Sequence, residues 1–215
     1  GALGYQPGAV MTNLLLADEI NRTSPKTQSA LLEAMEEGRV TVDGVTRDLP
    51  SPFVVLATQN PVGSAGTQNL PSSQLDRFLM KLSMGYPDRV SQVNILKDRQ
   101  GSDPLTTVEP VLDRETLETV IKVVEKTHVS DPIYEYIAAL AEVTRTHPLA
   151  LLGVSPRGAL ALCRAAKAKA FTEGRDYVLP EDVQAVAGYV LAHRLILSSK
   201  ARLNDRTAED LNLVL

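Results

Sequence analysis

The sequence predicts a protein in two parts, an α/β part followed by an all-α part. Two short apolar runs, at 14–17 and 53–58, each end in polar side chains. Continuous apolar runs of this length are typical of strands buried on both faces of a parallel sheet. From residue 111 onward the apolar residues instead recur with a helical period almost to the C-terminus. We therefore expect a parallel sheet with helices, and then a helical domain.

The first expected element is a buried strand at 14–17, and the helix that follows it has clear start and stop signals. Ser24 can cap this helix, and Pro25 suits its first turn. Gly38 can end it in a left-handed conformation, so the helix is expected at 25–37. Its apolar side chains recur three and four residues apart, which gives the helix one apolar face.

The remaining elements of the first part are short. An Asp-Gly pair after a polar, β-branched run suits a tight type I′ turn and predicts a hairpin. A tract rich in Pro, Gly, Ser, Asn and Gln predicts a loop, and alternating apolar and polar side chains after it predict a third strand. In chain order we expect hairpin strands at 39–42 and 45–49, a strand at 53–58, a loop at 61–74, a strand at 78–84 and a helix at 88–99.

The second part should consist of helices that are separated by prolines. Each of four segments carries an internal apolar stripe, and a proline lies at or near its start. These helices are expected at 113–127, 132–146, 155–173 and 180–197. We place the α/β core at 1–100, a linker at 101–112 and the helical domain at 113–215.

Composition excludes several classes of function. The formal net charge is -4, so no basic field attracts nucleic acid or an anionic membrane. Neither partner is expected, and no apolar run approaches the length that a membrane span requires. The single cysteine, Cys163, cannot form an internal disulfide, which favours a cytoplasmic protein.

The candidate site lies where the two apolar strands end. Asp18 and Glu19 follow the first strand, and Asn60 lies just beyond the second. Ligands of open α/β sheets bind outside the carboxyl ends of the strands. Asp18 suits a Mg²⁺ ion that keeps most of its waters, and Glu19 suits the orientation or deprotonation of an attacking water. From these residues alone, a solvated turn at the end of a strand explains the two acids equally well.

Longer motifs resemble those of AAA+ ATPases, and of their MoxR branch in particular. The resemblance covers 3–197, nearly the whole chain, and its motifs occur in the family's order. In the first part they read LLLADEINR from Leu14, PKTQSALLEAMEE from Pro25, VLATQNP from Val55 and LDRF from Leu75. In the second part they read TRTHP from Thr144, GVSPR from Gly153, GRDYV from Gly174, PEDV from Pro180 and VLAHR from Val190.

The resemblance implies a role for each candidate residue. Asp18 and Glu19 take the Walker B roles, with Asp18 toward Mg²⁺ through water and Glu19 polarising the hydrolytic water. Asn60 would be sensor 1, and Arg77 would be the arginine finger that reaches the nucleotide of the next subunit. Arg157 would be sensor 2, which couples the nucleotide to the lid. Whether it serves its own subunit's site or its neighbour's stays open.

Simpler interpretations of these residues also stay open. Asn60 could be a turn residue before a proline, and Arg77 could serve only as a partner of Asp76. Arg157 could be an arginine near a helix cap that binds no ligand. By the same resemblance the hairpin at 39–49 is the pore-facing pre-sensor 1 insertion, although a solvent-exposed hairpin explains it nearly as well.

The phosphate-binding loop of such ATPases is missing, since no Gly-x-x-x-x-Gly-Lys-Ser/Thr occurs in the sequence. Such a loop supplies most contacts to the phosphates. We therefore expect a C-terminal portion of an AAA+ core followed by a helical lid, and we expect this portion to be inactive alone.

The function that the resemblance implies belongs to the complete protein. It is hydrolysis of ATP with Mg²⁺ in an oligomeric ring, expected to be a hexamer, that remodels or activates partner complexes like a chaperone. The expected partners are other copies of the chain and a client or von Willebrand factor A domain protein. The alternatives are a nucleotide-independent protein-interaction module and a magnesium-chelatase-type AAA+ subunit.

Overall fold

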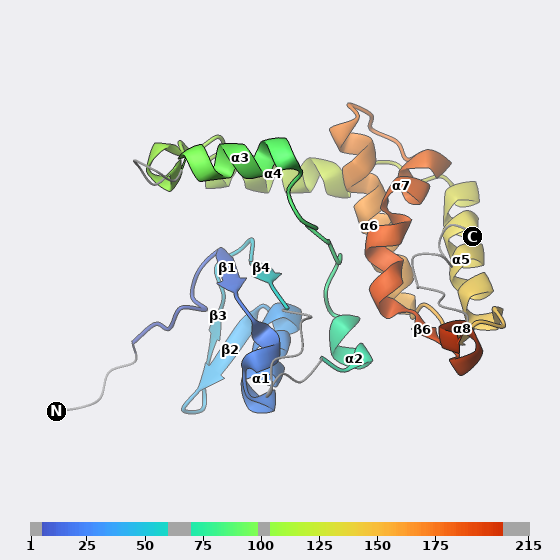
Figure 1. Cartoon of the computed structure of the whole chain (residues 1–215), viewed down its shortest axis with the longest axis horizontal. Coiled ribbons are helices and arrows are strands. Elements are labelled where there is room, and N and C mark those ends of the chain that lie inside the picture. Colours follow the sequence, from blue (N-terminus) through green and yellow to red (C-terminus); the bar gives the residue numbers. More distant parts are fainter. Residues whose placement is uncertain (1–5, 60–69, 99–103, 204–215) are drawn as a thin grey trace. The chain divides into compact units, whose positions relative to one another are not determined.

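A computed structural model of the chain describes residues 6–59, 70–98 and 104–203 (Figure 1). The chain divides into two compact units, Gly1–Leu79 and Met80–Leu215. Each unit is described by itself below. The division falls between Leu79 and Met80, whereas the linker was expected at 101–112.

The first unit contains the predicted parallel sheet. Strand β1 (Leu14–Ala17) pairs in parallel with β4 (Val54–Ala57), with Leu14 opposite Val54 and Ala17 opposite Ala57 (Figure 1). Because the two strands run in the same direction, the residues that follow Ala17 and Ala57 emerge at the same edge of the sheet. This edge carries the two acids.

The prediction that these strands are fully buried is wrong for one face of the sheet. Leu14 and Leu16 are 59% and 64% exposed, and Val54 and Leu56 are 44% and 54% exposed. Side chains alternate between the two faces of a strand, so these four residues share one face. A parallel strand is buried only when elements cover both faces, and no described residue of the first unit buries this one.

Helix α1 (Pro25–Glu37) and the hairpin form as expected. The Ser24 hydroxyl caps α1 by accepting from the Thr27 amide at 3.2 Å, and Gly38 ends the helix with φ of 64°. Strands β2 (Arg39–Val42) and β3 (Val45–Asp48) pair antiparallel around a two-residue turn. Both turn residues, Asp43 and Gly44, have positive φ, as a type I′ turn requires.

The prediction of a third strand at 78–84 is wrong. A short helix, α2 (Ser72–Leu75), begins within the expected loop at 61–74, and 78–84 adopts no regular structure. The alternating pattern was misleading because a strand also requires a neighbouring strand to satisfy its backbone. The Lys81 amide instead donates to the carbonyl of Tyr189 at 2.9 Å, and Met80 packs against the core of the second unit.

The second unit is predominantly helical, and its helix starts follow the predicted prolines. Helix α6 packs extensively against α7 and also contacts α4 and α5. The helices are α3 (Arg89–Asp98), α4 (Arg114–Glu125), α5 (Asp131–Thr146), α6 (Pro156–Thr172), α7 (Pro180–Leu191) and α8 (Ser199–Leu203). None of the described helices is long and apolar enough to cross a membrane.

The predicted helix at 180–197 is too long. Helix α7 ends at Leu191, a 3₁₀ turn (Ala192–Arg194) follows, and strand β6 (Ile196–Leu197) pairs antiparallel with β5 (Ala150–Leu152). The sequence gives little warning of this ribbon because two- and three-residue strands are too short to show a period.

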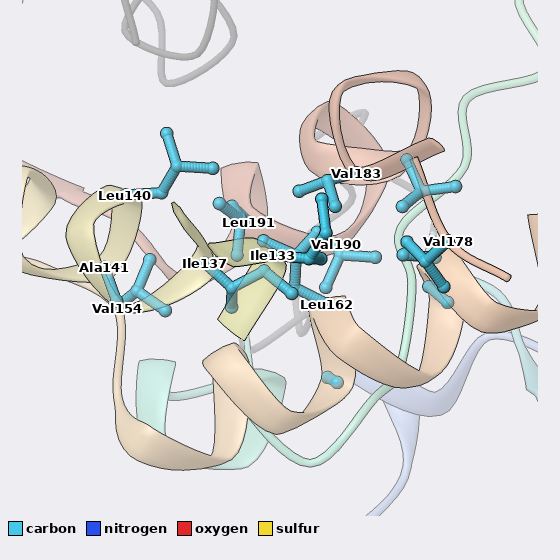
Figure 2. Close-up of a cluster of buried hydrophobic side chains, with 14 of the residues drawn as sticks. Ile133, Ile137, Leu140, Ala141, Val154, Leu162, Val178, Val183, Val190 and Leu191 are labelled. Atoms are coloured by element: carbon cyan, nitrogen blue, oxygen red, sulfur yellow. The ribbon is translucent and has the colours of Figure 1, made fainter. Parts of the chain in front are cut away.

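Aliphatic side chains from α5, α6 and α7 form the core of the second unit (Figure 2). Leu162 of α6 lies among Ile133 and Ile137 of α5 and Val190 of α7, and Val183 and Val190 have no exposed surface. The alanines of α6, among them Ala166 and Ala170, let the neighbouring helices approach closely. This core supports α6, the helix that carries the second unit's candidate residue.

Candidate active site

The Thr58 hydroxyl lies between the two predicted acids. It donates to Asp18 Oδ1 at 2.5 Å and accepts from the Glu19 amide at 2.8 Å. The backbone of Thr58 contributes as well, since its amide donates to Ala17 O at 3.1 Å and its carbonyl accepts from the Ile20 amide at 3.0 Å. The ends of β1 and β4 are therefore connected through a single residue of β4's C-terminal extension.

Glu19 has an unusual backbone conformation. Its φ and ψ are 49° and 46°, the left-handed region that residues other than glycine seldom adopt. Such residues persist where surrounding bonds hold them, and they are frequent in functional sites. The conformation reverses the chain direction after β1 and begins the 3₁₀ turn Ile20–Arg22. The Glu19 carboxylate forms a partly exposed ion pair with Arg22, at 3.0 Å.

A buried glutamine of α1 stabilises the turn after the acids. Gln28 is 4% exposed, and its side-chain amide donates to the carbonyls of Ile20 and Thr23, each at 3.2 Å. The Thr23 hydroxyl also donates to Ile20 O, at 2.7 Å. Ile20 itself is buried at 2% exposure. Helix α1 thus holds the segment after Glu19 in a fixed path.

Arg77 is bound to α1. Its Nη1 lies 2.9 Å from Glu36 Oε2 and 3.4 Å from the carbonyl oxygen of Leu32, and both acidic and basic side chains remain about one-third exposed. The simpler interpretation of Arg77 named Asp76 as its partner, and the structure shows an ion pair with Glu36. The arginine is close to α1 yet accessible to another molecule.

Asn60, the expected sensor 1, lies outside the described residues. Strand β4 ends at Ala57, and the described segment that follows it ends at Gln59, one residue before Asn60. Asn60 therefore stays a prediction that rests on its position in the sequence, two residues after Thr58.

Arg157 belongs to the second unit, where it is exposed in the first turn of α6. The loop before it is held by the other predicted lid motif. The Thr144 hydroxyl accepts from the Val154 amide at 2.9 Å, and Arg145 Nε donates to the Val154 carbonyl at 2.8 Å. The Ser155 hydroxyl then caps α6 by accepting from the Gly158 amide at 3.1 Å. Bonds between two neighbouring motifs thus fix where α6 begins, and with it the position of Arg157.

Comparisons with known proteins agree with this arrangement. Residues 1–80 match the model of the ATPase family associated with various cellular activities (AAA), and residues 142–212 match an AAA lid domain. The chaperone MoxR1 of Mycobacterium tuberculosis is 38% identical over 94% of this chain and 55% of its own length. The chain belongs to the MoxR family of AAA+ ATPases.

Other relatives of this MoxR-family chain extend the comparison. The uncharacterized protein YeaC of Bacillus subtilis is 52% identical over 95% of the chain and 64% of its own length. The crystal structure of a candidate ATPase from Cytophaga hutchinsonii superposes with a TM-score of 0.91 at 37% identity, covering 97% of this chain and 66% of that one. The chain thus spans less than two thirds of the length of these relatives.

The carboxylates of Asp18 and Glu19 in this MoxR-family chain have the ligand chemistry that a magnesium-bound nucleotide requires. Mg²⁺ is usually bound through one or two carboxylates together with substrate phosphates and waters. The exposed Asp18 carboxylate has one oxygen on Thr58, and it has a second oxygen that can hold a metal-bound water. Asp18 would hold the ion through water, and the ion would supply positive charge that stabilises the transferred phosphoryl group. No glycine-rich phosphate loop occurs in the sequence to hold the phosphates themselves.

The sequence did not single out two residues that shape this MoxR-family site. Thr58 was noted only as part of a strand end, and Gln28 only as one residue of a long motif. A hydroxyl at the end of the neighbouring parallel strand is the signal that could have identified Thr58, because such ends meet at one edge. Gln28 has no comparable signal, since a buried amide on a helix is visible only in three dimensions.

Proposed function

We propose that this chain is the Walker B-to-lid part of an ATPase that hydrolyses ATP to ADP and phosphate. The observation that carries the proposal is the pair of acids at the carboxyl end of β1, bonded to the end of the parallel strand β4. Asp18 would bind Mg²⁺ through water, and Glu19 would orient and polarise the attacking water. Asn60 would position the same water from the neighbouring strand.

The proposed protein works as a ring. Arg77 would reach the nucleotide of the adjacent subunit as an arginine finger, and Arg157 would couple the nucleotide to the lid. A planar cation of this kind stabilises the charge that spreads over the transferred phosphoryl group. The partial exposure of Arg77 supports this role, because a finger must be accessible to a second subunit.

The ring is proposed to be a cytoplasmic hexamer that remodels or activates partner protein complexes. The support is family membership and the name chaperone carried by the M. tuberculosis relative. A von Willebrand factor A domain protein is the proposed partner. The β2–β3 hairpin is the proposed contact with the client. Two apolar side chains beside its turn, Val42 and Val45, are exposed and could contact another protein.

The test uses the full-length ATPase with its phosphate-binding loop. Glu19→Gln keeps the size of the side chain and removes its charge, so nucleotide binding should persist while turnover falls by at least about 10³-fold. Calorimetry with ATP and Mg²⁺ measures binding, and release of phosphate measures turnover. Glu33→Gln, an exposed site on α1, is the matched control and should leave both unchanged.

Two outcomes would favour other functions. Unchanged turnover in Glu19→Gln contradicts the assignment of the site. Failure of the wild-type protein to bind ATP with Mg²⁺ favours a nucleotide-independent interaction module. A magnesium-chelatase role has support from the ChlI subunit of Nicotiana tabacum, which is 30% identical over 91% of this chain and 46% of its own length. The higher identity of the MoxR relatives favours the first function.

A further inference from the structure

We propose that Thr58 is a positioning residue that holds both acids of the site, Asp18 and Glu19, with one hydroxyl group. The inference rests on the proposed function, because it assigns a role within the same hydrolytic site. No family motif quoted above gives this threonine a role of its own. Its hydroxyl, rather than its packing, carries the proposal.

The direction of both hydrogen bonds follows from the chemistry of the groups. An ionised carboxylate only accepts, so the single hydroxyl proton of Thr58 must go to Asp18 Oδ1, 2.5 Å away. A backbone amide only donates, so the Glu19 N–H must point to a lone pair of the Thr58 hydroxyl oxygen, 2.8 Å away. One atom therefore orients the Asp18 carboxylate and the Glu19 backbone together.

The backbone around Thr58 makes the link rigid. The Thr58 amide and carbonyl bond to Ala17 and Ile20, the residues on either side of the two acids. These bonds hold Glu19 in its left-handed conformation, which determines the direction in which its side chain leaves the chain. The hydroxyl adds the remaining bond, because it accepts from the Glu19 amide itself.

Packing does not explain the side chain. Thr58 is exposed, so its hydroxyl is not forced to find a protein partner by burial. A valine has nearly the same shape and would satisfy any requirement for bulk at this position. The hydroxyl instead serves to bond the Asp18 carboxylate and the Glu19 amide. It lies two residues before the predicted sensor Asn60.

The experiment compares Thr58→Val and Thr58→Ser in the full-length ATPase. Valine removes the hydroxyl and should lower kcat by about 10²-fold, since a displacement of about 1 Å in a catalytic group has such an effect. Serine keeps the hydroxyl and should retain turnover within about three-fold of wild type. The affinity for ATP with Mg²⁺, measured by calorimetry, should change little in either variant.

A second measurement is independent of turnover. Hydrogen exchange at the Glu19 amide should accelerate in Thr58→Val and remain slow in Thr58→Ser, because only serine can accept that N–H. Thr119→Val is the matched control, since Thr119 is an exposed threonine of α4 whose hydroxyl bonds a helix carbonyl at 3.0 Å. It should change neither turnover nor exchange at Glu19.

The outcomes separate this inference from the proposed function. Normal turnover in Thr58→Val, with an inactive Glu19→Gln, overturns the role of Thr58 and leaves the ATPase site in place. Normal turnover in Glu19→Gln overturns the site itself. If Thr58→Val lowers the melting temperature, the turnover of Thr58→Ser becomes the deciding measurement. Loss of turnover in Thr58→Ser, which keeps the hydroxyl, would overturn the role of that hydroxyl.

Discussion

Glu19 and Arg22 form an ion pair across the 3₁₀ turn that follows β1, with 3.0 Å between Oε2 and Nη1. Both side chains are partly exposed, and such pairs are worth about 0.2–1 kcal/mol. In the proposed ATPase this pair competes with water for the carboxylate. Arg22→Ala should therefore raise basal turnover, by no more than about five-fold, because about 1 kcal/mol corresponds to that factor. Phosphate release without a client is the measurement.

The control for Arg22 is Arg22→Lys, which keeps a cation beside Glu19 and should leave basal turnover near the wild-type value. A fall in turnover in Arg22→Ala would contradict competition and indicate that the arginine assists the reaction. Neither variant should shift the melting temperature by more than a few degrees, since a loss of about 1 kcal/mol moves a domain of this size by about 2–4 °C.

Arg77 provides a prediction that only a ring can satisfy. Arg77→Ala should retain ATP binding and lose turnover by about 10³-fold or more, as expected for an arginine finger. Mixing Arg77→Ala subunits with Glu19→Gln subunits should restore part of the turnover, because an intact Glu19 site can then receive Arg77 from its neighbour. Turnover is measured as a function of the mixing ratio.

Glu36→Gln separates this role from a structural one. Arg77 lies 2.9 Å from Glu36, so an arginine that only stabilises α1 would lose its main partner in this variant. We expect turnover to survive in Glu36→Gln, because the arginine would still be available to the adjacent subunit. Equal loss in both variants, without recovery on mixing, would show that Arg77 acts on its own helix.

The elements with strong local signals were predicted from the sequence. The cap at Ser24, the stop at Gly38 and the Asp43-Gly44 turn each act through bonds within a few residues, and the structure has all three. Parallel pairing of β1 and β4 was also predicted correctly, because both runs are apolar and both end in polar residues. Local chemistry was sufficient for these features.

The failures concern interactions between distant residues. The stretch 78–84 alternates like a strand, yet its backbone bonds to Tyr189 of α7, which the local pattern cannot indicate. The link through Thr58 and the ion pair between Arg77 and Glu36 join residues 40 and 41 positions apart. The sequence therefore nominated candidate residues in the first unit, which stay predictions, but it did not indicate the contacts that hold Asp18, Glu19 and Arg77.

A partly buried ion pair in the lid predicts that stability depends on pH. Arg175 donates to both carboxylate oxygens of Asp182, at 2.5 and 2.7 Å, and Asp182 also caps α7 by accepting from the Leu179 amide at 2.8 Å. The hydrogen bonds from Arg175 lower the pKa of Asp182 below its ordinary value, despite the opposing effect of burial. Asp182 is 2% exposed.

Asp182→Asn keeps the shape and the cap but removes the charge, and should lower the free energy of unfolding by about 1–3 kcal/mol at pH 7, because the charge left on Arg175 remains partly in water. A carboxyl with a lowered pKa in the folded state stabilises above its unfolded-state pKa and loses that effect as pH falls through the folded-state value. The difference between wild type and variant should therefore shrink below about pH 4 in urea unfolding. Glu181→Gln, an exposed neighbour, should show no such dependence.

Gly158 and Gly188 form a matched pair of helix glycines. A Cβ at Gly158 would lie 2.7 Å from Val154 Cγ1 and 2.8 Å from Arg194 Cδ, while a Cβ at Gly188 would meet nothing within 4 Å. Gly158→Ala should destabilise the lid by about 1–3 kcal/mol through overpacking. Gly188→Ala should stabilise it by about 0.5–1 kcal/mol. Urea unfolding of both variants is the measurement.

The Gly158→Ala variant also tests the proposed role of Arg157 in turnover. Overpacking beside Arg194 would displace the first turn of α6, so turnover of the proposed ATPase should fall in Gly158→Ala and stay normal in Gly188→Ala. Lower stability with unchanged turnover would contradict a role for Arg157 at the nucleotide.

The exposed face of the β1–β4 sheet has a consequence for the behaviour of the chain in solution. Four large aliphatic side chains share it, and within the described residues each of these two strands pairs only with the other. Open strand edges beside an apolar surface favour association with other chains. The isolated 215-residue polypeptide should consequently show light scattering that increases with concentration and a short shelf life without detergent or a covering partner.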